Sequence, residues 1–141
     1  MIGEARTDEE ILATANVMLQ LRSSVAPDVY LSTVREMMRD GYRLVALRDD
    51  SGDVAAVAGF RSFAMLYTGG RILYVDDLST DANRRSKGHG HALLDWLKDE
   101  ARALGCTELH LDSGVQREQA HRFYFREGMG VNCLHFRIRL Q

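Results

Sequence analysis

The sequence predicts an α/β fold, an α+β arrangement with a mixed sheet in the order β-α-α-β-β-β-α-β-α-β. Three strand-like runs, 43–47, 54–67 and 72–78, are separated only by short turns, which is typical of an antiparallel meander. The third run is followed by a loop, an amphipathic helix and a further strand at 108–112. A right-handed crossover of this kind makes its two strands parallel. We therefore expect an antiparallel first part and one parallel pair in the middle of the sheet.

The first 40 residues are expected to form a short strand and two helices. Residues 2–6 can form the strand, and Thr7 followed by Glu10 is a capping box that opens the first helix. The only proline of the chain, Pro27, interrupts the helical pattern. A second short helix then begins at Tyr30 or Ser32 and ends before Asp40-Gly41.

The meander contains two local signals. Residues 49–53, Asp-Asp-Ser-Gly-Asp, have the composition of a hairpin turn. Gly59 lies inside an otherwise continuous strand pattern. A glycine in such a place indicates a β-bulge or the close approach of another group.

The last third of the chain predicts two helices and two strands. Leucines and alanines recur at helical spacing up to Leu104, and Gly105 follows as a stop. After the strand at 108–112, residues 116–127 form the second helix, which Gly128 ends. Residues 131–140 alternate apolar and polar side chains, which predicts a final strand.

Composition limits the class of protein. The chain has 141 residues, of which 45% are hydrophobic and 27% charged, so we expect one domain over residues 1–141 with a real core. Its net charge of −2 gives no bulk attraction to nucleic acid or to an anionic membrane, and no apolar run reaches the length of a span. Two cysteines without metal spacing are expected to be free thiols in the cytoplasm.

The most informative stretch is the loop Arg84-Arg85-Ser86-Lys87-Gly88-His89-Gly90, between a strand and a helix. The first N–H groups of a helix have no intrahelical partner, and the helix dipole is positive there. Glycines let a ligand approach the backbone, and the neighbouring cations add charge. The loop therefore predicts a phosphate site. It lacks the dinucleotide fingerprint, because Leu93 stands at the third glycine position, and it lacks the Walker pattern.

Two motifs resemble those of the GNAT acyltransferase superfamily. Arg85, Gly88 and Gly90 match R-x-x-G-x-G, the acetyl-CoA-binding motif, and residues 120–129 resemble A-x-x-x-Y-x-x-x-G-F, with Met129 in place of the phenylalanine. The resemblance is specific over about 71–130 and topological before that. It implies a GNAT fold, whose two parallel strands splay apart around pantetheine. Arg117 stands where the family often has an asparagine whose side chain contacts the cofactor.

The resemblance also implies the cofactor contacts. Loop amides would hold the pyrophosphate of acetyl-CoA, the strand backbone from Leu78 to Thr80 would pair with pantetheine, and a backbone N–H near Leu78 would stabilise the thioester oxyanion. The cofactor residues expected in this way are Leu78, Ser79, Thr80, Arg84, Arg85, Ser86, Lys87, Gly88, His89, Gly90 and Tyr124.

Acyl transfer to an amine needs an acid and a base. An alkyl ammonium, with a reference pKa of ~10.4, must lose a proton before it attacks, and the thiolate leaves more easily when it is protonated. The resemblance assigns Tyr124 as the acid; the alternative is a tyrosine that only packs in the core. Asp76, or next to it Asp77, matches the place of an acidic residue that deprotonates the amine, often through water. Adjacent strand residues face opposite sides, so the two are not expected to form a paired-carboxylate site. The alternative is a structural aspartate that bonds a nearby backbone N–H.

The five histidines are not expected to form a metal site. His89 and His91 have no third ligand in range, and histidines such as His110, His121 and His135 are more often surface or core residues.

The sequence predicts a cytoplasmic N-acetyltransferase that uses acetyl-CoA and a primary amine of a small molecule or peptide. By resemblance, residues 21–30 and 132–136 would form the acceptor pocket. An acyl-CoA-binding regulatory module and an ATP- or NAD-binding domain are the alternatives. A homodimer is expected, because the final strand would lie near a sheet edge.

Overall fold

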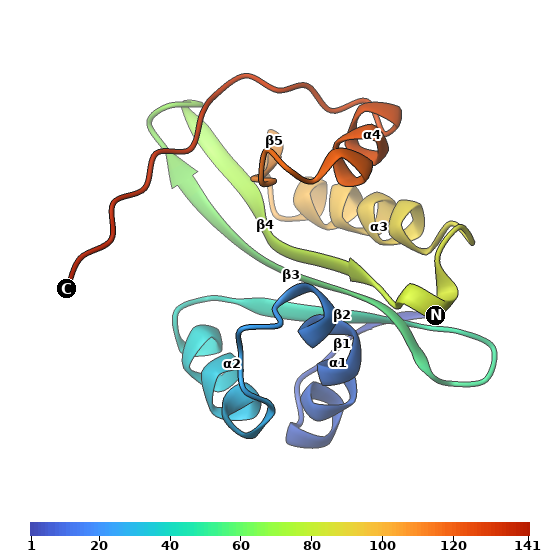
Figure 1. Ribbon diagram of the computed structural model, residues 1–141. Helices are drawn as coiled ribbons and strands as arrows, with labels where there is room; N and C mark the ends of the chain where they lie inside the picture. Colours follow the sequence, from blue (N-terminus) through green and yellow to red (C-terminus); the bar gives the residue numbers. More distant parts are fainter. The chain divides into compact units, whose positions relative to one another are not determined.

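The computed structural model describes all residues, 1–141, and the chain divides into two compact units, Met1–His110 and Leu111–Gln141. The first unit contains helices α1 to α3 and strands β1 to β4 in full, and β5 ends at the boundary between the units. The second unit contains helix α4 and the C-terminal segment (Figure 1).

A five-stranded mixed sheet forms the centre of the first unit, with the strands in the order β1-β2-β3-β4-β5. The pairs β1–β2, β2–β3 and β3–β4 are antiparallel. The crossover through α3 makes β5 parallel to β4, and the amide of Thr107 donates to the carbonyl oxygen of Arg71 at 2.9 Å where the two strands begin. The mixed sheet expected from the sequence is confirmed. The strands are β1 Ile2–Glu4, β2 Arg43–Arg48, β3 Val54–Met65, β4 Gly70–Thr80 and β5 Glu108–Leu111.

Helices α1 (Asp8–Leu21) and α2 (Tyr30–Arg39) lie on one side of this sheet, and α3 (His89–Ala103) lies on the other (Figure 1). The predicted capping box starts α1: the amide of Glu10 donates to Thr7 Oγ1 at 3.1 Å, and the amide of Thr7 donates to Glu10 Oε2 at 3.0 Å. These bonds satisfy two amides that the first turn leaves without a partner.

Both faces of the sheet are packed with apolar side chains. On the α1–α2 side, buried residues of the helices meet those of β2 and β3 in one cluster, which includes Ile11, Val17, Met18, Val34, Leu44 and Val57. On the α3 side, the Phe60 ring packs edge-on against Trp96 with a centroid distance of 6.0 Å. Fully burying a side chain of this size stabilises a protein by about 1.5–3 kcal/mol, so these layers hold β3 and β4 firmly in place.

Gly59 has both features that a strand glycine indicates. The register between β3 and β4 shifts after it, since Gly59 pairs with Asp77 and Phe60 pairs with Val75. A Cβ atom on Gly59 would lie 1.7 Å from the hydroxyl oxygen of Tyr42, so only glycine fits there. The close approach and the bulge are both confirmed.

The C-terminal segment differs from the expectation. Helix α4 (Glu118–Arg126) forms and is followed by Gly128 at a φ of 88°, but residues 131–140 form no strand. The apolar residues of their alternating pattern are exposed: Leu134, Phe136, Ile138 and Leu140. Alternation specifies two faces, whereas a strand also needs a neighbour for its backbone groups, and a local pattern cannot supply that neighbour.

No helix has the length and apolar character needed to cross a membrane. Both cysteines, Cys106 and Cys133, are free thiols, in agreement with the expectation from their spacing.

Candidate active site

The loop between β4 and α3 is the first part of the candidate site. The chain leaves β4 at Thr80 and passes through a short 3-10 helix, Ala82–Arg84. Ser86 and Gly88 both have positive φ, 65° and 80°, and Gly88 is the N-cap of α3. No side chain caps the helix there, and a Cβ atom on Gly88 would meet nothing within 4 Å. The first amides of α3 thus have no side-chain cap, and the space beside Gly88 is open, an arrangement that can bind phosphate.

The start of this loop is fixed to α1 and β3. Asp81 is buried, and its amide donates to the carbonyl oxygen of Ala55 at 2.8 Å. The side chain of Gln20 bonds the loop twice, because its Nε2 donates to Asp81 Oδ1 at 3.2 Å and its Oε1 accepts from the amide of Ala82 at 2.9 Å. The loop therefore starts from a fixed position on the sheet.

Arg84 ties the same loop to the turn between β2 and β3. Its guanidinium forms ion pairs with Asp49 at 2.8 Å, with Asp53 at 3.1 Å and with Asp81. Hydrogen bonds from Ser51 and Arg84 lower the pKa of the Asp49 carboxyl well below its usual range. Three carboxylates thus surround Arg84, so its charge fixes the loop. Its predicted contact with the cofactor stays a prediction.

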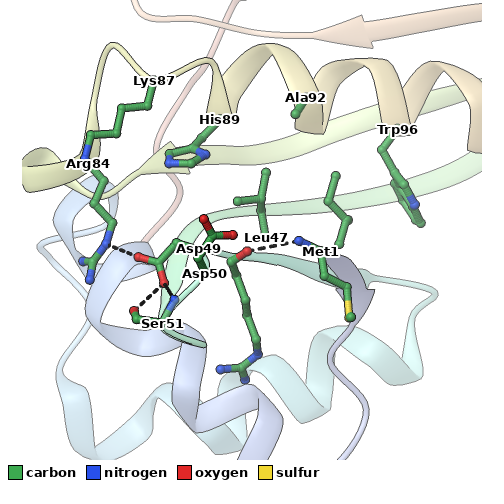
Figure 2. Close-up of a pocket in the computed structure, with 12 residues that line it drawn as sticks. Met1, Leu47, Asp49, Asp50, Ser51, Arg84, Lys87, His89, Ala92 and Trp96 are labelled. Carbon is green, nitrogen blue, oxygen red and sulfur yellow. Dashed lines mark hydrogen bonds and ion pairs between the residues drawn. The ribbon is translucent and has the colours of Figure 1, made fainter.

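A cavity of about 800 Å³ lies beside the loop (Figure 2). Residues from α3 and the preceding loop, including Lys87, His89 and Trp96, line one side of it, and Met1 and Leu47 belong to the opposite side. The N-terminal amine of the chain donates to the carbonyl oxygen of Arg48 at 3.1 Å at its edge. The walls therefore combine apolar surface with basic side chains and with the acidic Asp49 and Asp50, next to the β4–α3 loop.

The outer part of β4 carries Leu78, Ser79 and Thr80, the residues expected to pair with pantetheine. Because β5 begins beside Arg71 and has only four residues, it accompanies only the first half of the 11-residue β4. Ser79 turns its hydroxyl toward α1, where it donates to the carbonyl oxygen of Val17 at 3.1 Å. The side chain of Ser79 is thus engaged by α1 and is not available to a ligand.

The bulge in β4 changes the placement of the two candidate carboxylates. Asp76 has no partner residue in β3, because Asp77 pairs with Gly59 and Val75 pairs with the next residue, Phe60. An extra residue breaks the strict alternation of faces. Phe60 faces α3, so Arg61, the next residue of β3, faces the α1–α2 side, where it holds Asp76. Asp77 accepts from Tyr42, which belongs to the core on the same side, and burial and Asp77 together raise the pKa of this tyrosine far above its usual range. The expectation that Asp76 and Asp77 face opposite sides is therefore wrong.

Asp77 is held through both of its oxygens. The hydroxyl of Tyr42 donates to Oδ2 at 2.7 Å, and Arg22 Nε donates to Oδ1 at 2.8 Å. Arg22 also donates from Nη2 to the carbonyl oxygen of Asp76 at 2.8 Å. The residue after α1 thus reaches the bulge of β4 and fixes both the side chain and the backbone there.

Asp76 is held by a different arginine. Arg61 of β3 donates from Nε at 3.0 Å and from Nη2 at 2.7 Å to the two oxygens of Asp76. Such two-point contacts between guanidinium and carboxylate are the strongest ion pairs of this type. From the sequence, Arg22 was expected only as part of the acceptor segment 21–30. Tyr42 and Arg61 were not expected at the site. An arginine two residues after the bulge glycine, in an otherwise apolar strand, was the available signal.

Tyr124 lies on α4, in the second unit. Its ring packs edge-on against that of Phe123, with a centroid distance of 5.4 Å. In the same unit, His135 Nδ1 lies 2.9 Å from Asp112 Oδ2. The role of Tyr124 as an acid stays a prediction.

Comparison with known proteins defines the class. The model of the Acetyltransferase (GNAT) family matches residues 8–130. The chain therefore belongs to the GNAT acetyltransferase family, and the resemblance seen in its two motifs is confirmed.

Two relatives bear names in the same class. The chain is 35% identical over 117 residues to the uncharacterized N-acetyltransferase YhdJ of Bacillus subtilis (strain 168), covering 82% of this chain and 81% of that protein. It is 34% identical over 97 residues to the aminoalkylphosphonate N-acetyltransferase of Salmonella typhimurium, covering 69% of this chain and 60% of that protein. The protein is thus an N-acetyltransferase by family.

Solved structures agree on the fold. A ribosomal-protein-alanine N-acetyltransferase from Brucella melitensis superposes with a TM-score of 0.83 at 20% identity, over 99% of both chains. An acetyltransferase from Trypanosoma brucei superposes with a TM-score of 0.79 at 21% identity, also over 99% of both chains. At this level of identity, the likeness shows the fold.

Proposed function

We propose that the protein transfers an acetyl group from acetyl-CoA to a primary amine of a small molecule or peptide. The observation that carries the proposal is the uncapped N-terminus of α3 behind Gly88, in a loop with the R-x-x-G-x-G pattern. Pyrophosphate is the group of acetyl-CoA that such a terminus would bind. The relatives that bear N-acetyltransferase names support the amine as acceptor.

The reacting end of the cofactor would lie along the outer part of β4. Its pantetheine would pair with the backbone of 78–80, the part of the strand that extends past β5. An amide near Leu78 would then donate to the thioester oxygen as negative charge develops on it. One donor of this kind typically contributes about 10²–10³-fold to kcat.

Asp76 and Asp77 are the proposed proton acceptors for the amine, acting through water. Their position at the bulge, one or two residues before Leu78, supports this role. Both are held by arginines, which fixes the carboxylates in place. Tyr124 is the proposed acid for the departing thiolate.

An acyl-CoA-binding regulatory module without turnover is the alternative. It would bind the same cofactor and leave it unchanged. A thermal-shift comparison of acetyl-CoA, ATP and NAD, followed by turnover assays with a panel of amines, tests both readings, because a ligand that binds the folded state raises its melting temperature. Stabilisation by ATP or NAD alone would overturn the proposal. Stabilisation by acetyl-CoA without acetylation of any amine would favour the regulatory module.

We further propose that the protein is a cytoplasmic homodimer. The exposed apolar residues of the C-terminal segment, among them Phe136 and Ile138, support an assembly that covers them. Light scattering at working concentration should give twice the mass of the 15.9 kDa chain. A monomer mass would exclude the dimer.

A further inference from the structure

The cluster at the β4 bulge presents its positive side to solvent. The side chains of Arg22 and Arg61 are 48% and 42% exposed, respectively. Their carboxylate partners, Asp77 and Asp76, are only 11% and 15% exposed. A molecule that approaches the bulge from solvent therefore meets guanidinium groups first.

Both arginines are fixed to the same two residues. Arg22 contacts the Asp77 carboxylate and the Asp76 carbonyl oxygen, and Arg61 contacts the Asp76 carboxylate. Consecutive Cα atoms are about 3.8 Å apart, so the two side chains are anchored at neighbouring points. They come from different elements, one from the end of α1 and one from β3.

Each guanidinium keeps donors for a further partner. A guanidinium has five N–H groups in a planar fork. Arg22 and Arg61 each use Nε and Nη2 for the bulge, which leaves Nη1 of both side chains for a ligand. The Arg61 guanidinium also lies 6.0 Å from the centroid of the Tyr74 ring, which limits its freedom to move. Fixed guanidinium groups with remaining donors favour carboxylate and phosphate-like anions.

We propose that the acceptor is a small amine that carries an anionic group, a carboxylate or a phosphonate, and that Arg22 and Arg61 bind this group. The inference rests on the proposed acetyl transfer at β4. Leu78, whose amide would face the thioester, is two residues beyond Asp76, or about 7 Å along a strand. A short aliphatic linker between amine and anion spans such a distance. A purely cationic acceptor would instead meet two exposed guanidinium groups of like charge.

Matched acceptors test the proposal. We expect kcat/KM for β-alanine and 2-aminoethylphosphonate to exceed that for propylamine and ethylamine by about tenfold or more, the usual value of a hydrogen bond to a charged group. Arg61→Gln and Arg22→Gln should remove most of this preference, mainly through KM for the anionic amines. Arg61→Lys keeps the positive charge beside Asp76 but loses the planar set of guanidinium donors. This variant should therefore retain part of the preference for anionic amines.

Arg71→Gln is the matched control, because Arg71 is an exposed arginine at the far end of β4 that bonds Ser62. This variant should keep the full preference. Melting temperatures of all variants separate lost recognition from lost folding. Equal or better use of propylamine or putrescine by the wild type, or an unchanged preference in Arg22→Gln and Arg61→Gln, would overturn the proposal.

A binding measurement without turnover distinguishes failure of this inference from failure of the proposed function. Calorimetry with β-alanine, in the presence of coenzyme A to fill the phosphate loop, should detect binding that Arg61→Gln weakens by about tenfold. Absence of that binding in a protein that still binds coenzyme A overturns the inference alone. A wild-type protein that binds no acetyl-CoA and acetylates no amine would instead overturn the proposed function.

Discussion

The hydroxyl of Tyr42 occupies the space that a side chain on Gly59 would need. The Tyr42 oxygen lies 1.7 Å from the position of a Cβ atom on Gly59, while the same hydroxyl donates to Asp77. The bulge, the buried tyrosine and the carboxylate thus form one unit. A change at any of them should affect the other two.

Gly59→Ala should therefore destabilise the protein. The added methyl would displace the Tyr42 ring and break its bond to Asp77, and overpacking of this kind typically costs about 1–3 kcal/mol. Chemical denaturation measures the change in the free energy of unfolding. Gly3→Ala is the control, because a Cβ atom there meets nothing within 4 Å. Equal stability of the two variants would contradict the packing described here.

Stability should fall in acid, and part of that fall should come from the contacts of the β4–α3 loop. The pKa of Asp49 is lowered by Ser51 and Arg84, and the pKa of Asp81 is lowered by the amide of Asn83 and by Gln20. A carboxyl with a lowered pKa in the folded state stabilises it above the unfolded pKa, ~3.9, and loses this contribution as the pH falls toward the folded value.

Asp49→Asn should accordingly unfold more easily at pH 7 and show a shallower loss of stability below pH 4. Unfolding curves from pH 2 to pH 7 check this. Asp50→Asn, at the neighbouring exposed position, is the control and should follow the wild type. Parallel pH profiles for Asp49→Asn and the wild type would rule out the contribution of Asp49.

Gly88→Val should abolish binding of coenzyme A. Gly88 has a φ of 80°, which a β-branched residue adopts only with strain, and its side chain would enter the open space before the first amides of α3. Calorimetry with coenzyme A measures the loss, and circular dichroism checks that the chain still folds. Gly69→Val, at a φ of 72° in the β3–β4 turn, carries similar strain and should bind normally. Wild-type affinity in Gly88→Val would remove the loop from the cofactor site.

Tyr124→Phe should bind acetyl-CoA nearly normally and lose most of kcat. The substitution keeps the ring and its packing on Phe123 and removes only the hydroxyl. General acid catalysis typically contributes about 10²–10⁴-fold. The deficit should shrink for an acyl donor with a more acidic thiol, which leaves more easily. A tyrosine that serves only packing would instead give a lower melting temperature with nearly unchanged kcat per folded molecule.

Much of the fold follows from local signals. The capping box of Thr7 and Glu10, the turn at 49–53 and the helical spacing up to Leu104 each depend on residues close together in the chain. Their physical causes, backbone capping and amphipathic periodicity, are therefore visible in the sequence. The phosphate loop belongs to this group, since a helix start and its glycines are contiguous.

Tertiary structure alone decided the contacts between distant segments. The sequence indicated a bulge or close approach at Gly59. Only the packed sheet shows that Asp76 is the extra residue and that both carboxylates lie on the α1–α2 side. The partners of these carboxylates, Arg22 and Arg61, lie 55 and 15 residues away from them in the chain. No local pattern encodes such pairs, because strand register and the end of a helix must first be fixed by packing.

In the C-terminal segment, a local pattern is present but the tertiary contact that it needs is not. Residues 131–140 carry a clear alternation of apolar and polar side chains, yet they form no strand in the structure. The sequence by itself determined the GNAT class, the order of the earlier elements and the glycine-containing loop that opens α3, because each depends on contiguous residues. Tertiary structure decided which charges meet at the β4 bulge and which segment finds a strand partner, since both depend on backbone groups that distant parts of the chain supply.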